Sequence, residues 1–298
     1  MKQNVIELTY VKAYVIIALW KKVEEVLYKD YQGLKNIPDK GDGRMDLNLK
    51  GKVAIVTGGG SGLGAGISES LAREGVDVIV NYIVDEENVI KFVDELNRTY
   101  NTRSIAMYGD ITKASDIENI LKSAELAYGR IDILVNNAGI WPTTPVTEIS
   151  DEEWDRVIKI NLNGPFYFSK RFVNYLLKAG RPGNIVNTLS KSGFAVSSPG
   201  HAHYASAKGG LNLFTKALAR EVSAHGIIVC GIAPGMVRTP LNVSTLSDPE
   251  MMRKYLERIP VGKMSDAEDI GALVAFLVSD KSYLFAGSLI DVTGGMLI

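Results

Sequence analysis

Short apolar runs separated by longer amphipathic stretches recur along the chain from residue 53 onward. The runs are rich in β-branched residues and end in Gly, Asp or Ser, except the second, which ends in Asn-Tyr. Helical spacing of apolar residues marks the stretches between the first six runs. Uninterrupted apolar strands that alternate with helices are typical of a parallel sheet covered on both faces. The pattern predicts one doubly wound α/β domain over residues 45–298, with seven strands within 53–59, 76–82, 104–110, 131–139, 184–190, 227–235 and 288–295.

The first 44 residues do not share this rhythm. Apolar positions between residues 11 and 27 recur at helical spacing and predict an amphipathic helix, and residues 36–44 have the turn formers and charges of a linker. The apolar segment 13–20 is too short to cross a bilayer, and no signal-peptide cleavage pattern follows it. A membrane-surface role is the alternative, although acidic residues interrupt the basic face. We expect residues 1–44 to be an appendage, or an overlong translation start upstream of Met45, without stable membrane insertion.

Composition narrows the class of protein. The 298 residues are 46% hydrophobic and carry a net charge of −1, as in ordinary soluble globular proteins, so no footprint for nucleic acid is present. The single cysteine, Cys230, lies in an apolar run and is expected to be a small buried hydrophobe. Because one cysteine cannot form an intrachain disulfide, a reducing cytoplasm is the expected location.

A glycine-rich turn follows the first predicted strand. Residues 57–64 read TGGGSGLG and lead into a predicted helix. Gly58, Gly62 and Gly64 would permit a tight turn, close approach of a pyrophosphate and close helix packing. The N-terminus of the helix adds backbone N–H groups and a positive dipole end. Between the first strand and the first helix of an α/β domain, this turn predicts dinucleotide binding rather than an ordinary loop.

Polar or small residues also stand at the ends of three later strands. Asp110 follows the third, the Asn-Asn-Ala-Gly segment 136–139 follows the fourth, and the Pro-Gly segment 234–235 follows the sixth. Each alone is ordinary turn chemistry. The carboxyl ends of parallel strands share one edge of the sheet, so together these residues predict a ligand site. The Asp110 carboxylate is placed to accept a hydrogen bond from an adenine amino group.

A tyrosine stands four residues before a lysine in the segment HYASAKGG, residues 203–210. Positions i and i+4 share one face of a helix, so Tyr204 and Lys208 are expected side by side. A neighbouring ammonium favours the phenolate and lowers the pKa of a phenol. The pair predicts a proton donor to a substrate, although this spacing also arises by chance in helices.

The motifs TGGGSGLG, NNAG, YASAK and PGMVRT follow one another in the chain, and with them residues 45–298 resemble the short-chain dehydrogenase/reductase family. The resemblance implies a Rossmann-type fold and hydride transfer between a nicotinamide cofactor and an alcohol or carbonyl substrate. It leaves only residues 1–44 unmatched.

The resemblance implies four catalytic residues and no metal. Tyr204 would exchange a proton with the substrate oxygen, and Ser190 would orient that oxygen. Lys208 would lower the pKa of the phenol from about 10 toward working pH and hydrogen-bond the nicotinamide ribose. Asn161 would hold a water in a proton relay through the lysine. The alternatives are a helix kink for Asn161 and a loop hydroxyl for Ser190.

Cofactor contacts follow from the same resemblance. They comprise the glycine-rich turn, the strand ends and the tyrosine–lysine pair: Gly58, Ser61, Gly62, Leu63, Gly64, Tyr82, Asp110, Ile111, Asn137, Ala138, Gly139, Tyr204, Lys208, Pro234, Gly235, Val237 and Thr239.

Three departures from the family pattern stand out. Ser190 and Tyr204 are 14 positions apart, where most relatives have 13; Ser190 is preferred over Ser192 because Gly193 then falls at the family's following glycine. The segment Asn-Thr-Leu-Ser, 187–190, replaces Asn-Ile-Ser-Ser and removes a neighbouring hydroxyl. The last strand ends in DVTGG instead of Val-Asp-Gly-Gly, which would alter a subunit contact more than the chemistry.

The choice between NAD and NADP depends on the end of the second strand. NAD-dependent relatives tend to place an acid there, whereas NADP-dependent ones place a cation nearby. Here Tyr82 takes the acid's position, Ile83 takes one cation position and Ser61 the other. The sequence therefore places no cation to bind a 2'-phosphate and no acid to exclude one. NAD is the expected cofactor, and NADP is possible.

The pattern is closest to glucose or aldose 1-dehydrogenases and to 3-oxoacyl-acyl-carrier-protein reductases, and we take a sugar as the best expectation. Trp141, His201 and His203 would present an aromatic face and polar groups to a polyol, with helix capping as the alternative for His203. Residues 240–262 are expected to form a lid. A non-catalytic NAD(P)-binding sensor or scaffold is the alternative of another class, although the tyrosine or lysine is usually lost in such proteins.

Two predicted helices, 154–178 and 204–224, carry apolar residues on more than one face. One face covers the sheet, so the second needs another partner. In relatives these helices pair across a two-fold axis and the last strand forms a second contact, which implies a homotetramer. The altered last strand is the reason the assembly would stop at a dimer.

Overall fold

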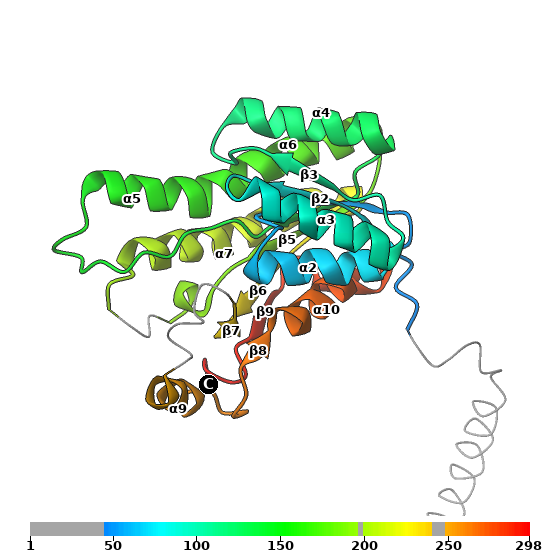
Figure 1. Ribbon diagram of the computed structural model, residues 1–298. Coiled ribbons are helices and arrows are strands. Elements are labelled where there is room, and N and C mark those ends of the chain that lie inside the picture. Colours follow the sequence, from blue (N-terminus) through cyan, green and yellow to red (C-terminus); the bar gives the residue numbers. More distant parts are fainter. Residues whose placement is uncertain (1–44, 196–198, 240–247) are drawn as a thin grey trace, which may run out of the picture. The chain divides into compact units, whose positions relative to one another are not determined.

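The computed structural model describes residues 45–195, 199–239 and 248–298 (Figure 1). The predicted N-terminal helix and linker lie outside these ranges, and so do residues 240–247 of the predicted lid. All but the first two described residues belong to one compact unit, Leu47–Ile298.

A seven-stranded sheet forms the centre of this unit. Its strands are β1 (Val53–Thr57), β2 (Asp77–Tyr82), β3 (Ile105–Tyr108), β4 (Ile133–Asn136), β5 (Gly183–Thr188), β6 (Ile227–Pro234) and β9 (Leu289–Val292). They lie in the order β3-β2-β1-β4-β5-β6-β9, and every neighbouring pair is parallel. Each strand overlaps one of the seven predicted runs, so the predicted Rossmann-type sheet is confirmed.

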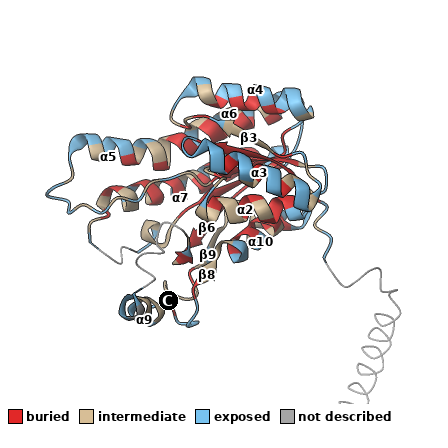
Figure 2. Cartoon of the chain, in the orientation of Figure 1, coloured by how far each residue is buried: buried red, intermediate tan, exposed pale blue. Residues whose placement is uncertain are grey.

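Helices cover both faces of the sheet (Figure 1). The helices are α2 (Gly62–Arg73), α3 (Glu86–Tyr100), α4 (Ala114–Tyr128), α5 (Asp151–Ile158), α6 (Gly164–Ala179), α7 (Ala202–Val222), α9 (Pro249–Leu256) and α10 (Ala267–Leu277). One apolar cluster joins the sheet to α2, α3 and α10, and a second joins it to α4, α6 and α7. The five inner strands are mostly buried, the edge strands β3 and β9 are mostly half-buried, and most helices keep exposed residues on their outer faces (Figure 2).

Two local features depart from the predicted elements. The helix expected over 154–178 is divided by a π-helical turn, Lys159–Asn163, between α5 and α6. Two short strands, β7 (Val237–Arg238) and β8 (Ser265–Asp266), form a separate parallel pair beyond the main sheet. Short 3₁₀ turns complete the described chain: Lys191–Gly193, Ser223–His225 and Asp280–Phe285.

The strand order places a crevice at the carboxyl edge of the sheet. The chain proceeds outward from β1 through β2 to β3, and then returns to the other side of β1 to form β4. Loops after β1 and β4 therefore leave the sheet in opposite directions, and ligands bind in α/β sheets at such a point. The predicted cofactor residues lie on these loops and their neighbours.

Candidate active site

The glycine-rich turn between β1 and α2 forms a cradle that admits no side chain at its centre. A Cβ at Gly64 would lie 2.0 Å from the Gly58 carbonyl oxygen, and Gly58 and Gly62 have φ angles of +60° and +52°. Ser61 is exposed at the N-cap of α2, with Leu63 half-buried behind it. Free N–H groups at the start of a helix stabilise an anion, so the turn fits a pyrophosphate.

The end of β4 is tied to this cradle. Backbone N–H groups of Asn137 and Ala138 donate to the Thr57 hydroxyl at 2.9 and 3.0 Å. The Asn137 amide also donates to the carbonyl oxygens of Thr57 and Gly58. Asn137 therefore supports the cofactor cradle through its backbone, and its side-chain amide is engaged within the protein.

Asn161 lies in the π-helical turn and is completely buried. Its Nδ2 donates to the carbonyl oxygens of Ile140 and Val157, both at 3.0 Å, and its Oδ1 accepts from the Ile140 N–H. A Cβ at Gly139 would lie 2.6 Å from that Oδ1. The π turn brings the Asn161 amide against the loop after β4, so a helix irregularity is present at this predicted site residue.

Tyr204 and Lys208 lie on the first turns of α7, with the Lys208 Nζ 5.7 Å from the centre of the Tyr204 ring. Ser190, two residues after the end of β5, interacts through its side chain with Tyr204. The Lys208 Nζ donates to the Thr188 carbonyl oxygen at 2.7 Å. Ser190, Tyr204 and Lys208 thus meet at the carboxyl edge of the sheet, beside the buried Asn161.

Two opposing effects act on the phenol. Burial raises the pKa of Tyr204, and the hydrogen bond from Ser190 lowers it without cancelling the rise. Burial also lowers the pKa of Lys208 to about 8. The predicted decrease in the phenol's pKa is therefore not what this environment produces, because desolvation outweighs the stabilising hydrogen bond.

The turn that follows Ser190 packs tightly against α7 at Gly193. A Cβ at Gly193 would lie 2.8 Å from the carbonyl carbon of Lys208, so only glycine lets this turn pack against α7. The Ser192 N–H donates to the Ser190 hydroxyl at 3.2 Å. The contact at Gly193 supports Ser190, and not Ser192, as the serine beside Tyr204.

Tyr82, Asp110 and Ile111, which are predicted to face the adenosine of the cofactor, lie at the ends of β2 and β3. The Asp110 carboxylate accepts from the N–H and hydroxyl of Thr112, and Ile111 is buried. The Tyr82 hydroxyl donates to the Glu86 carboxylate at 2.7 Å, which raises the pKa of Tyr82 to about 12. A carboxylate therefore stands at the end of β2 after all, four residues beyond the expected position.

The predicted residues after β6 return the chain to the glycine-rich turn. A Cβ at Gly62 would lie 3.6 Å from Thr239, so these two loops are in contact. Pro234 and Val237 are buried, and Gly235 packs closely on Thr293. The strand end thus closes the crevice from the side opposite β2.

Trp141 lies beside Tyr204, with ring centroids 6.5 Å apart and 48% of its surface exposed. His201 stacks against it at 4.8 Å and binds the Pro142 carbonyl oxygen through Nδ1. His203 is different: its ring is completely buried and both nitrogens are bonded within the protein. This placement disfavours the predicted substrate contact for His203 and favours the capping alternative.

Sequence reasoning missed Glu86, Glu153 and the Thr188 carbonyl. Glu153 and the Thr188 carbonyl bond partners 50 and 20 residues away in sequence, and Glu86 bonds Tyr82 across the turn after β2. Hydrophobic periodicity predicts neither long-range contacts nor the direction of a turn. The only local signal was Ser150, three residues before Glu153, which is a helix-capping pattern.

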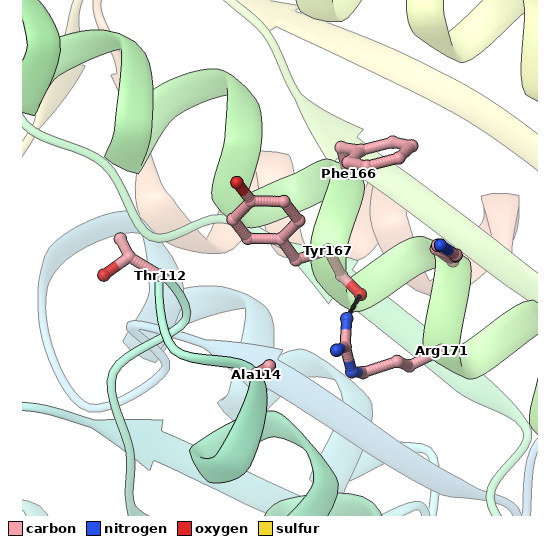
Figure 3. A pocket seen from close by; sticks show the side chains of 6 residues that line it. Thr112, Ala114, Phe166, Tyr167 and Arg171 are labelled. Atoms are coloured by element: carbon pink, nitrogen blue, oxygen red, sulfur yellow. Dashed lines mark hydrogen bonds between the residues drawn. The ribbon is translucent and has the colours of Figure 1, made fainter.

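A surface pocket of about 360 Å³ opens elsewhere, beside α6. Figure 3 shows its lining, with the Arg171 guanidinium donating to the Tyr167 carbonyl oxygen. The lining shares Thr112 with the Asp110 end of the crevice and includes none of Asn161, Ser190, Tyr204 and Lys208. The lining residues are Thr112, Ala114, Phe166, Tyr167, Lys170 and Arg171.

Comparison with known proteins agrees with this geometry. The profile of the family described as short chain dehydrogenase matches residues 52–250. The chain belongs to the short-chain dehydrogenase/reductase family. It is therefore an NAD(P)-dependent oxidoreductase that acts on CH–OH groups, and the non-catalytic alternative is set aside.

Relatives within the family differ in substrate. The chain is 37% identical over 251 residues to 3beta-hydroxysteroid dehydrogenase 1 of Eggerthella lenta, which covers 84% of this chain and 95% of the relative. It is 36% identical to a 3-oxoacyl-acyl-carrier-protein reductase of Staphylococcus epidermidis, over 82% and 98% of the two chains. A solved structure from Agrobacterium tumefaciens, of a protein proposed to be a 2-deoxy-D-gluconate 3-dehydrogenase with bound NADP, superposes with a TM-score of 0.76. That protein is 32% identical, over 85% of this chain and 99% of its own.

No helix within the described ranges is long and apolar enough to span a membrane. Those ranges also contain no group of three or more His, Cys, Asp or Glu side chains arranged to hold a metal ion. Cys230 is buried in β6.

Proposed function

We propose that the chain transfers a hydride between NAD and a hydroxyl-bearing substrate, with Tyr204 as the acid–base group. The observation that carries this proposal is the meeting of Ser190, Tyr204 and Lys208 at one point of the crevice. The glycine cradle, which a single Cβ would fill, fits the pyrophosphate of the cofactor.

Each side chain has a definite task in this proposal. Bound NAD supplies the hydride acceptor. Tyr204 receives the proton of the substrate hydroxyl, or returns it to a carbonyl oxygen. Ser190 orients that oxygen through the hydroxyl that it presents to Tyr204. Lys208, with a pKa of about 8, is mostly protonated at neutral pH, and its charge favours the phenolate as the proton moves.

Preference for NAD is supported by the carboxylate at the end of β2. Tyr82 holds Glu86 at 2.7 Å, in the region where a 2'-phosphate would add negative charge. Like charges repel, so NADP is expected to bind more weakly. Titration with each cofactor, followed by thermal shift, tests this: Glu86→Gln should improve NADP binding and leave NAD binding unchanged. Equal affinity of the unmodified protein for both cofactors would contradict the preference.

A sugar is the substrate class we favour. The exposed face of Trp141 lies beside Tyr204 and is held by the His201 stack, which suits the apolar edge of a polyol. A β-ketoacyl substrate is the second candidate, because the chain shares 36% identity with a 3-oxoacyl-acyl-carrier-protein reductase.

A substrate panel decides between these classes. Hexoses, acyclic secondary alcohols, β-ketoesters and a 3-hydroxysteroid would be tested with NAD(H) and NADP(H), and absorbance at the nicotinamide band followed. A kcat/KM at least tenfold higher for a hexose supports the sugar proposal. A preference for the β-ketoester supports the second candidate. Absence of turnover with every substrate of the panel would contradict both proposed substrate classes.

The catalytic domain is proposed to comprise residues 45–298, with residues 1–44 as a dispensable extension. The first strand begins only at Val53, eight residues after Met45. Protein starting at Met45 should therefore fold and turn over the best substrate at the rate of the full chain. Loss of solubility or activity would show that the extension belongs to the functional assembly.

A further inference from the structure

A buried histidine, His203, is paired with the partly exposed Glu153 next to Tyr204. The Tyr204 backbone N–H donates to Nδ1 of His203 at 2.9 Å, and Nε2 of His203 lies 3.0 Å from Oε1 of Glu153. Because Nδ1 accepts a hydrogen bond, the ring proton lies on Nε2, where it is donated to the carboxylate. The partners of His203 thus determine its tautomer.

The bond from Tyr204 satisfies a donor that the helix itself leaves free. α7 begins at Ala202, and N–H groups in the first turn of a helix have no intrahelical acceptor. The N-cap residue, His201, makes no side-chain capping bond. The His203 ring therefore anchors the backbone from which the acid–base side chain projects.

Glu153 also holds a second element. Its Oε1 accepts from the Thr144 hydroxyl at 2.8 Å, in addition to His203. Hydrogen bonds from Thr144 and then His203 lower the pKa of Glu153, which keeps it a carboxylate. Ser150 caps the Glu153 N–H at the start of α5, so the carboxylate projects from an anchored turn.

The two segments that meet at Glu153 are joined at further points. The Thr144 N–H donates to the Gly200 carbonyl oxygen at 2.9 Å, and His201 binds the Pro142 carbonyl oxygen. Trp141 stacks on His201. The loop that carries Trp141 and the start of the helix that carries Tyr204 therefore form one connected unit.

We propose that Glu153 is a positioning residue that holds Tyr204 through His203 and the Trp141 loop through Thr144. The proposal rests on the proposed function of Tyr204 as acid–base group. The two hydrogen bonds to Glu153, here called the His203 arm and the Thr144 arm, have different effects. The His203 arm determines the rate of proton transfer, and the Thr144 arm determines the affinity for substrate.

Kinetics of separate variants distinguish the arms. Rates are expressed per NADH-binding site, with the best substrate of the panel. His203→Ala is expected to lower kcat about 10- to 100-fold, because a displacement near 1 Å at the reacting group costs about 10²-fold. Thr144→Val, which keeps the histidine–glutamate pair, is expected to raise KM severalfold with kcat nearly unchanged. Glu153→Ala should show both effects.

Rescue and a matched control separate positioning from general stability. Glu153→Gln retains an oxygen acceptor and should recover most of the activity lost in Glu153→Ala. Asp155→Ala removes an exposed carboxylate of the same helix and should behave as the unmodified protein. Hydrogen exchange of the Tyr204 amide should be faster in His203→Ala and Glu153→Ala, and unchanged in Asp155→Ala.

Failure of the positioning role can be distinguished from failure of the proposed function by comparing these variants with Tyr204→Phe. If Tyr204→Phe is inactive while His203→Ala and Thr144→Val keep the kcat and KM of the unmodified protein, the positioning role is wrong and the proposed function stands. If Glu153→Ala only lowers the melting temperature, with unaltered kinetics per site, Glu153 is a structural residue and the proposal fails. If Tyr204→Phe keeps its rate, the proposed function and this inference fall together.

Discussion

Lys208 combines a buried position with a charge that the proposed proton transfer requires. Its side chain is 4% exposed and makes one bond, from Nζ to the Thr188 carbonyl oxygen. Burial lowers its pKa to about 8 by disfavouring the ammonium. The ammonium is therefore retained near neutral pH at the expense of stability, a conflict common at functional sites.

This conflict predicts a pH-dependent stability difference between the unmodified protein and Lys208→Met. The folded-state pKa of about 8 lies below the unfolded value of about 10.4. Between these values the unfolded chain binds a proton that the folded chain has lost, so stability rises with pH there. Relative to Lys208→Met, the unmodified protein should gain about 2–3 kcal/mol of unfolding free energy between pH 8 and 10. Denaturant unfolding at several pH values measures this, and a constant difference would contradict the buried ammonium.

Ser190 and Ser192 offer a matched pair of substitutions two residues apart. Ser190→Ala removes the hydroxyl that bonds Tyr204 and should lower kcat/KM about tenfold or more. Ser192 contributes its backbone N–H to Ser190, which alanine keeps, so Ser192→Ala should be near normal. Steady-state kinetics on the same substrate suffice, and the reverse ranking would show that the longer loop shifts the register.

Local spacing in the sequence predicted which residues lie together at the site, but it did not predict their pKa values or their hydrogen-bond partners. Four residues along a helix bring Tyr204 and Lys208 together whatever surrounds them. Desolvation depends on everything packed around a group, so the raised pKa of Tyr204 followed from the fold and not from the motif. His203 shows the same limit, because its partner Glu153 lies 50 residues away.

At the scale of elements, the contact between the turn Lys191–Gly193 and α7 gives a sharp test. A Cβ at Gly193 would press on the Lys208 backbone at 2.8 and 2.9 Å, so Gly193→Ala should displace Ser190 and lower kcat with NADH affinity largely unchanged. Gly209→Ala, whose Cβ meets only the Gly193 carbonyl oxygen at 3.7 Å, should be tolerated. If both variants have equal kcat, the close packing does not position the serine.

Element types were predictable because buried parallel strands read as continuous apolar runs, as in the residues of β1 and β6. The π turn at Asn161 was not, since no periodicity distinguishes it from the α-helix on either side. The β7–β8 pair was missed because two-residue strands are too short to carry a pattern.

At the scale of the whole molecule, the outer faces of α6 and α7 carry apolar side chains that the unit does not bury. Phe166 is 41% and Leu213 68% exposed, and Phe166 contacts Phe214 edge-on across the two helices at 5.7 Å. These side chains agree with the second apolar face inferred from the sequence, and we propose that a second copy covers it.

Light scattering at micromolar concentration is expected to give the mass of a homotetramer. Leu213→Glu would place a charge on the proposed interface and should lower the mass to that of a smaller assembly. A dimer in the unmodified protein would point to the altered last strand, β9, and a monomer would contradict helix pairing.

Tyr204 is proposed to transfer the proton in an NAD-dependent reaction. Single-turnover measurement of nicotinamide absorbance, with the unmodified protein and Tyr204→Phe at equal occupancy of NADH sites, tests it most directly. Removing the hydroxyl should slow hydride transfer about 10²–10⁴-fold, with NADH affinity little changed. A Tyr204→Phe variant that keeps more than about a tenth of the rate would show that Tyr204 is not the acid–base group.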